Sequence, residues 1–193
     1  MLTGAALATA RGTDSPANML ITSVKPKITR EQAVAKFRAG LSELRRGRLR
    51  AVTEFYVPYR FFQLNWSDGR RAAETFLAAD AVTGRLDPIE FDQLPADGEM
   101  VSVDARMIAE ECVSEEEAHG LIRERMMRSV FTKGFFKLTS VDVEINLAAS
   151  LHIPYWIGVY ERQERAHLEI INGLQGRFEG AKLREMVAEW FQQ

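Results

Sequence analysis

The chain has 193 residues, of which 46% are hydrophobic and 27% are charged, and its formal net charge is -2. This composition is typical of a globular protein with a core, and the weak net charge gives no overall attraction to nucleic acid or to an anionic membrane. The single cysteine, Cys112, excludes an intramolecular disulfide and a cysteine-based zinc site. No run approaches the roughly 20 apolar residues that span a bilayer. The N-terminus makes a poor signal peptide, so we expect a cytoplasmic protein.

The first third of the chain predicts an arm followed by a helix. Residues 1–27 are rich in Ala, Thr and Ser and predict an N-terminal arm, with one possible edge strand at 19–24. Thr29 and Gln32 are spaced as a capping box, so we expect a helix to begin there. The same helix is expected to end at Gly47.

A β-rich stretch follows this helix. We expect three strands, at about residues 49–66, 73–81 and 85–91. Residues 99–112 then serve as a connection, and the pattern at 101–111 fits a strand or a short helix equally well.

The second half of the chain follows the same order of elements. Ser114 and Glu117 are spaced as a second capping box at the start of a helix. A final helix is expected from about Glu179, because Leu183 and Val187 lie on one apolar face. The strands expected in between cover about residues 137–145, 151–160 and 167–171.

Three blocks of sequence occur twice, in the same order. The matched blocks are residues 28–33 with 113–118, 57–61 with 153–157, and 80–86 with 172–178. Self-similarity of this kind predicts a duplicated unit. We therefore predict an α+β fold with two tandem repeats of a helix packed on an antiparallel sheet, at residues 28–98 and 113–193, the second repeat ending in the C-terminal helix.

One face of the matched strands is unusually aromatic. Because side chains alternate along a strand, that face carries the following residues: Tyr56, Arg60, Phe62, Trp66, His152, Trp156 and Tyr160. We expect a helix to pack on the opposite face, around Tyr155. The aromatic face must also be covered, by the other repeat, by a second protein chain or by a ligand.

Two prolines lie in the middle of these strands. Pro58 and Pro154 cannot donate a hydrogen bond to a neighbouring strand. The strands are therefore expected either to lie at a sheet edge or to contain a bulge there.

The sequence contains no recognisable catalytic motif. It lacks a nucleophile elbow and a phosphate-binding glycine loop, so we do not expect an enzyme or a cofactor. The three histidines, His119, His152 and His167, have no metal-ligand spacing, and we expect no metal. His152 and His167 lie on neighbouring predicted strands and could pair across the sheet, together with Glu169.

Both halves contain motifs of a known family. The first half has Thr-Arg-Glu-Gln-Ala at residues 29–33 and Asp-Ala-Val-Thr-Gly-Arg at 80–85, and the second half has Ser-Glu-Glu-Glu-Ala at 114–118. Residues 28–91, and more loosely 113–178, resemble the PepSY-type module. The resemblance implies a helix laid over an antiparallel sheet and a binding or regulatory role. It brings no catalytic residue to this chain.

Three functions are considered. The first is a non-enzymatic binding or interaction protein, a homo-oligomer or partner of another protein, that uses the aromatic face. The second is a groove between the repeats for a small molecule or peptide, in which Arg60 fixes an anionic group. The third is nucleic-acid binding through the basic stretch Arg45, Arg46, Arg48 and Arg50, although the overall acidity of the chain argues against it.

Overall fold

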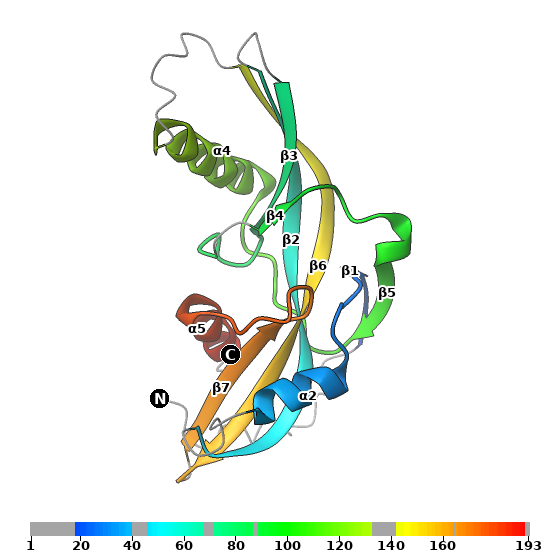
Figure 1. The fold of residues 1–193 in the computed structure, drawn as a ribbon, viewed down its shortest axis with the longest axis vertical. Coiled ribbons are helices and arrows are strands. Elements are labelled where there is room, and N and C mark those ends of the chain that lie inside the picture. The colour runs from blue at the N-terminus through cyan, green and yellow to red at the C-terminus, as the bar shows by residue number, and fades with distance from the viewer. Residues whose placement is uncertain are drawn as a thin grey trace. The chain divides into compact units, whose positions relative to one another are not determined.

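The structure is a computed structural model of the chain, and it describes residues 18–39, 46–67, 72–86, 89–132, 142–163 and 165–191. Over these residues the fold is α+β, with one mixed seven-stranded sheet (Figure 1). The helices are α2 (Arg30–Arg38), α4 (Glu115–Thr132) and α5 (Ala181–Trp190). None of the described helices has the length and hydropathy needed to cross a membrane.

The strand order of the sheet is β4-β3-β2-β6-β1-β5, and β7 also pairs with β6. The strands are β1 (Met19–Val24), β2 (Arg48–Ser67), β3 (Ala72–Asp80), β4 (Ile89–Phe91), β5 (Met100–Ala105), β6 (Asp142–Arg162) and β7 (Arg165–Asn172). The hairpins β2–β3 and β6–β7 are antiparallel, whereas β1 meets β6 in parallel at Ser23 and His152.

The chain divides into two compact units, and neither is a continuous stretch of sequence. Unit 1 is made of residues 1–57, 99–109 and 152–193, and unit 2 is made of residues 58–98 and 110–151. The division falls inside β2 and inside β6, so each unit contains a part of both long strands.

Helix α2 of unit 1 begins where the sequence predicts. Thr29 Oγ1 accepts a hydrogen bond from the Gln32 N–H at 3.3 Å, and Gln32 Oε1 accepts one from the Thr29 N–H at 2.9 Å. This capping box satisfies two N–H groups that the first helical turn leaves without partners. The helix ends at Arg38, because Ala39 is already extended. Residues 40–45, which precede the end predicted at Gly47, lie outside the described residues.

The core of unit 1 forms where α2 meets β6. Phe37 is fully buried, and its ring meets the ring of Tyr160 edge to face at 6.4 Å. The Tyr160 hydroxyl donates a 2.6 Å hydrogen bond to the Phe37 carbonyl oxygen. A Cβ atom on Gly158 would lie 2.8 Å from the Phe37 ring. A glycine at 158 therefore lets the helix come this close to the strand.

Helix α5 also belongs to unit 1, and its apolar residues match the prediction. Leu183, Met186 and Val187 are buried, and the Trp190 ring lies 5.2 Å from the ring of Phe55. Phe55 lies on β2, so α5 supplies part of the cover for that strand.

The core of unit 2 forms where α4 meets the β2–β3 hairpin. Ser114 Oγ accepts from the Glu117 N–H at 3.2 Å and Glu117 Oε2 accepts from the Ser114 N–H at 2.8 Å, which confirms the second capping box. Ala118 and Ile122 on α4 are fully buried against Phe62 and its neighbours in the hairpin.

The predicted break in the strand before Leu151 is wrong. Residues 142–162 form one continuous strand, β6, where the sequence predicted one strand ending at 145 and another starting at 151. Residues 146–150 carry no β-branched side chain, so their own preference for strand structure is weak. The neighbouring strand β2 is itself 20 residues long, and a long neighbour supports strand structure through such a segment. Residues 100–105, for which the sequence fitted two alternatives, form strand β5.

The two prolines lie where a long strand changes its neighbour. On β2, Tyr56 bridges to Ile108, and pairing with β3 begins at Tyr59. On β6, the corresponding change occurs between His152 and Tyr155. A residue without an N–H group is tolerated at such a change, because no regular ladder hydrogen bond is required from it.

Candidate functional site

In unit 1 the aromatic face is covered by helix α2. Trp156 and Tyr160 are 3% and 0% exposed, and they pack with Ala33 and Phe37 of that helix. The indole N–H of Trp156 donates to the Ile28 carbonyl oxygen at 3.3 Å. Helix α2 therefore contacts the aromatic face, whereas the sequence predicts a helix on the opposite face, around Tyr155.

Tyr56 and His152 complete the aromatic face in unit 1. Tyr56 is 4% exposed, packs with Ile21 and Ala105, and its hydroxyl donates to Glu54 Oε2 at 3.1 Å. Burial, followed by the negative charge and the hydrogen bond of Glu54, raises the pKa of the Tyr56 hydroxyl far above its usual range. His152 is only half-buried, and its Nδ1 lies 3.2 Å from the Thr22 carbonyl oxygen.

The remaining residues of this face belong to unit 2. Phe62 is fully buried under α4, and the His119 ring meets it edge to face at 6.1 Å. Arg60 forms an ion pair with Glu111 at 3.1 Å. Trp66 lines an open hollow of about 610 Å³ together with residues 65, 67, 72–74, 143 and 144.

The cover of the aromatic face is thus largely supplied by the chain itself. Tyr56, Phe62, Trp156 and Tyr160 lie in the packed interior, whereas Arg60, Trp66 and His152 reach the surface.

A buried carboxylate on β7 forms a second candidate site. Glu169 lies in the apolar run 168–171 and is only 4% exposed. The register of β7 on β6 pairs Glu169 with Gly158 and His167 with Tyr160. A carboxylate removed from water to this extent needs hydrogen-bonding or charged partners.

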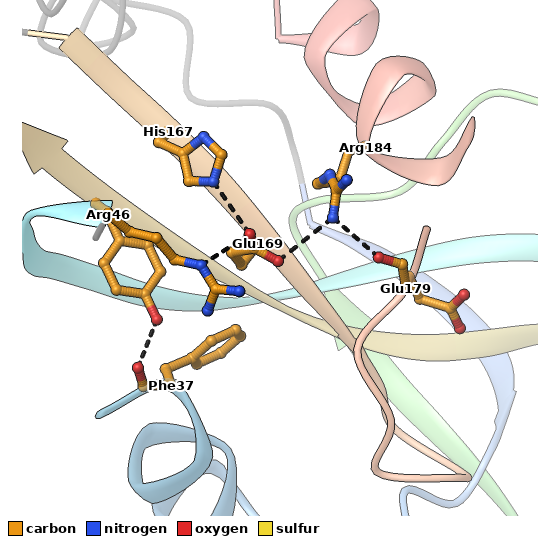
Figure 2. Close-up of polar contacts among 7 residues, drawn as sticks. Phe37, Arg46, His167, Glu169, Glu179 and Arg184 are labelled. Atoms are coloured by element: carbon orange, nitrogen blue, oxygen red, sulfur yellow. Dashed lines mark hydrogen bonds and ion pairs between the residues drawn. The ribbon is translucent and has the colours of Figure 1, made fainter. Parts of the chain in front are cut away.

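Three cationic or basic side chains supply these partners. Arg46 Nε lies 3.1 Å and His167 Nε2 lies 3.0 Å from Glu169 Oε1, and Arg184 Nη1 lies 3.4 Å from Oε2. Figure 2 shows Arg46 and Arg184 approaching the carboxylate from different sides. Arg184 Nη1 also donates to the Glu179 carbonyl oxygen at 3.1 Å. We call Arg46, His167, Glu169 and Arg184 the Glu169 cluster.

The Glu169 cluster is buried at its centre and open at its rim. The Glu169 side chain is 6% exposed, whereas those of Arg46, Arg184 and His167 are 33%, 34% and 50% exposed. The Arg46 guanidinium also lies 5.5 Å from the ring centre of Phe178, a cation–π distance. Solvent therefore reaches the cations but hardly reaches the carboxylate.

The sequence identifies part of this cluster. His167 contacts Glu169, but the pairing of His152 with His167 across the sheet is wrong, because His167 lies opposite Tyr160. The sequence indicates Arg46 only as part of a basic stretch, and it does not single out Arg184. The available signal was a single acidic residue inside the apolar run 168–171, because such a residue requires cationic partners from elsewhere in the chain.

Two arginines of the basic stretch form ion pairs within unit 1. Arg50 pairs with Glu161, and Arg46 belongs to the Glu169 cluster. Arg48 is exposed, and Arg45 lies outside the described residues. Within the described ranges, His, Cys, Asp and Glu form no group of three that could hold a metal ion.

Comparisons with known proteins do not assign the chain to a family. No family model, curated protein or solved structure gives a significant match.

Proposed function

We propose that this chain is a non-enzymatic binding protein, built from two repeats of one helix–hairpin unit, and that it binds a ligand at the Glu169 cluster. The proposal has two parts. Matched contacts support the repeats, and one departure from the match supports the location of the binding site.

The entry to each helix makes the same contact with a hairpin. The N–H groups of Lys27 and Ile28 donate to the Gly173 carbonyl oxygen at 2.9 and 3.3 Å. Those of Cys112 and Val113 donate to the Ala81 carbonyl oxygen at 2.8 and 2.9 Å. The donors and acceptors of the two contacts occupy equivalent places in or beside the matched sequence blocks.

The turns of the two hairpins match as well. Gly84 and Gly176 both have a φ of 64°. A Cβ atom on Gly84 would meet Leu121 and Val113, and one on Gly176 would meet Lys36 and Ile28, which are their counterparts in the other repeat.

These contacts imply that the two repeats exchange their helices. The helix of the first repeat, α2, packs on the β6–β7 hairpin of the second repeat, and α4 of the second repeat packs on the β2–β3 hairpin of the first. The aromatic face is then the surface on which each repeat holds the helix of the other. Under this proposal, the predicted interaction surface forms a contact within the chain.

The main support for a binding function is a difference between two equivalent positions, one in each repeat. Tyr155 pairs with Asn172 and Tyr59 pairs with Asp80, so the register of the two hairpins makes Glu169 equivalent to Leu77. Leu77 packs on the core under α4. The same register makes His167 equivalent to Thr75.

The repeat therefore does not require a buried carboxylate at this position. A buried ion cluster is in general a weak source of stability. Ionisable groups at a place that an apolar side chain can fill are typical of a functional site.

The test is a variant that makes unit 1 resemble unit 2, Glu169→Leu combined with His167→Thr. We expect it to fold with a free energy of unfolding within about 1 kcal/mol of wild type, or higher, because Arg46 and Arg184 can be solvated once the carboxylate is removed. Urea unfolding measures this. A loss of about 3–5 kcal/mol, typical of a broken structural ion pair, would contradict a functional role for the cluster.

A further inference from the structure

We infer that the Glu169 cluster binds a small organic oxyanion, in which the charged group contacts Arg46 and Arg184 and an apolar group lies on Phe178. The inference rests on the proposed function and names its class of ligand. Arg46 and Arg184 are the contact residues, and Glu169 is a positioning residue.

The charge of the cluster favours an anion. Two guanidinium groups meet one carboxylate, so the cluster keeps an excess positive charge even when His167 is neutral. The side chain of Glu179 is directed elsewhere, because its Oε1 accepts a 3.0 Å hydrogen bond from Asn172 Nδ2 and Figure 2 shows its carboxylate on the side away from Arg184.

Both arginines retain donors for a ligand. Arg46 contacts Glu169 through Nε, and Arg184 uses Nη1 for both of its contacts. Among the described residues, the other guanidinium nitrogens of these two side chains have no partner. Each guanidinium carries five N–H donors in a planar fork that matches the oxygens of a carboxylate or a phosphate.

The arginines are held in place before a ligand arrives. Glu169 is buried and gives one oxygen to each of them, while the Phe178 ring supports Arg46 and the Glu179 carbonyl supports Arg184. A fixed side chain loses less conformational entropy on binding, so this arrangement raises the affinity for an anion.

Phe178 supplies an apolar surface next to the cations. It is 44% exposed, and its ring packs at 5.8 Å, edge to face, against the buried ring of Phe37. The exposed part of a ring that is fixed in this way can stack on an aromatic or aliphatic group. An organic anion therefore fits the site better than an inorganic one.

The experiment measures the affinity of the full chain for phenyl phosphate, benzoate and inorganic phosphate by isothermal titration calorimetry at low ionic strength. We expect phenyl phosphate or benzoate to bind more tightly than inorganic phosphate, and the stronger of these two identifies the oxyanion. Arg46→Gln and Arg184→Gln should each weaken binding about tenfold or more, because each removes charge-assisted hydrogen bonds.

Two further variants separate the roles of the residues. Arg85→Gln is the matched control, since it removes the same charge from an exposed side chain at the turn of unit 2, and we expect a change of less than about twofold. Glu169→Gln should weaken binding if Glu169 orients the arginines. A purely electrostatic effect of removing its negative charge would strengthen binding instead.

Each outcome decides a part of the inference. If none of the three anions binds, or if binding survives both arginine variants, the oxyanion site is wrong. If inorganic phosphate binds as well as phenyl phosphate and Phe178→Ala has no effect, the apolar part of the inference is wrong. The proposed function is judged separately, by the stability of the variant Glu169→Leu/His167→Thr.

Discussion

Units 1 and 2 each place a helix over a two-stranded hairpin with the same entry contact, but they fill the space beneath the helix differently. In unit 2, Phe62 and Ile122 belong to one apolar cluster, and Leu77 packs against that cluster. In unit 1, Glu169 is paired with Arg46 and Arg184, and Gly158 allows the Phe37 ring to approach the strand. The difference shows that apolar side chains can fill the space beneath the helix in this arrangement, as they do in unit 2. The polar groups of the other unit therefore call for a different explanation.

The two hairpin turns make a second comparison. Asp80 is 1% exposed, and its two oxygens accept hydrogen bonds from the N–H groups of Val82, Thr83, Gly84 and Leu86. Asn172 is equally buried, accepts through Oδ1 from the N–H groups of the two residues that follow Gly173, and donates through Nδ2 to Glu179. The Asp80 side chain therefore acts only as a hydrogen-bond acceptor in the first turn, whereas the Asn172 side chain acts as both acceptor and donor in the second.

The largest effect on the free energy of unfolding is expected from a comparison of two strand residues at equivalent positions, Trp156 and Arg60. Trp156→Ala should cost about 3–5 kcal/mol, because it leaves a cavity under α2. Arg60→Ala should cost about 1 kcal/mol or less, because its partner Glu111 is exposed. Urea unfolding measures both. Light scattering should give the same mass for Trp156→Ala as for wild type, and a change from dimer to monomer would instead assign this residue to self-association.

The next effect is expected at the turns. Asp80→Asn should cost about 1.5–3 kcal/mol, because an amide nitrogen in place of Oδ2 cannot accept from the Leu86 N–H. The reverse change, Asn172→Asp, should also destabilise the protein, since it places a carboxylate against Glu179. Thermal melts of the two variants test this, and a neutral result for both would show that the turns tolerate either residue.

A smaller effect is expected for the glycines with positive φ. Gly84→Ala and Gly176→Ala should each cost about 1–2 kcal/mol, because other residues rarely adopt this conformation. Gly84→Ala should be the worse of the two, since its Cβ would lie 2.6 Å from Leu121 Cδ1, compared with 3.2 Å from Ile28 Cγ2 for Gly176→Ala. Denaturant unfolding should rank them in this order, and the opposite order would mean that Leu121 moves aside easily.

The smallest effect concerns the two capping boxes. Hydrogen bonds from the Ser114 backbone and side chain lower the pKa of Glu117 below its ordinary value of 4.5. Its stabilisation is therefore present above about pH 4.5 and is lost as the pH falls through the lowered pKa. Gln32, at the same position of the α2 box, has no charge to lose. Glu117→Gln should make acid unfolding slightly less steep, and an unchanged pH profile would contradict this.

Local features of the fold could be predicted from the sequence. The capping boxes at Thr29 and Ser114 and the apolar face of α5 depend on residues a few positions apart, and all three are confirmed. The continuity of β6 was missed, because a long neighbouring strand overrides the weak strand preference of residues 146–150.

Non-local features could not be predicted in the same way. The sequence does not specify which hairpin each helix covers, since an apolar helix face fits more than one sheet. For the same reason the sequence places His167 and Glu169, two residues apart, in one candidate group, but it does not add Arg184 on α5 or Arg46 just before β2. A buried charge in the sequence indicates that the chain supplies partners for it, but which residues these are depends on the tertiary fold.

The passage of β2 and β6 through both units has a genetic consequence. A premature stop codon between β5 and α4 would delete α4 from unit 2 and, at the same time, β7 and α5 from unit 1. A single proteolytic cut in this connection would likewise leave two fragments that each contain pieces of both cores. Because neither core is encoded as one uninterrupted segment, we expect truncated alleles to behave as complete losses of the protein rather than as partial ones.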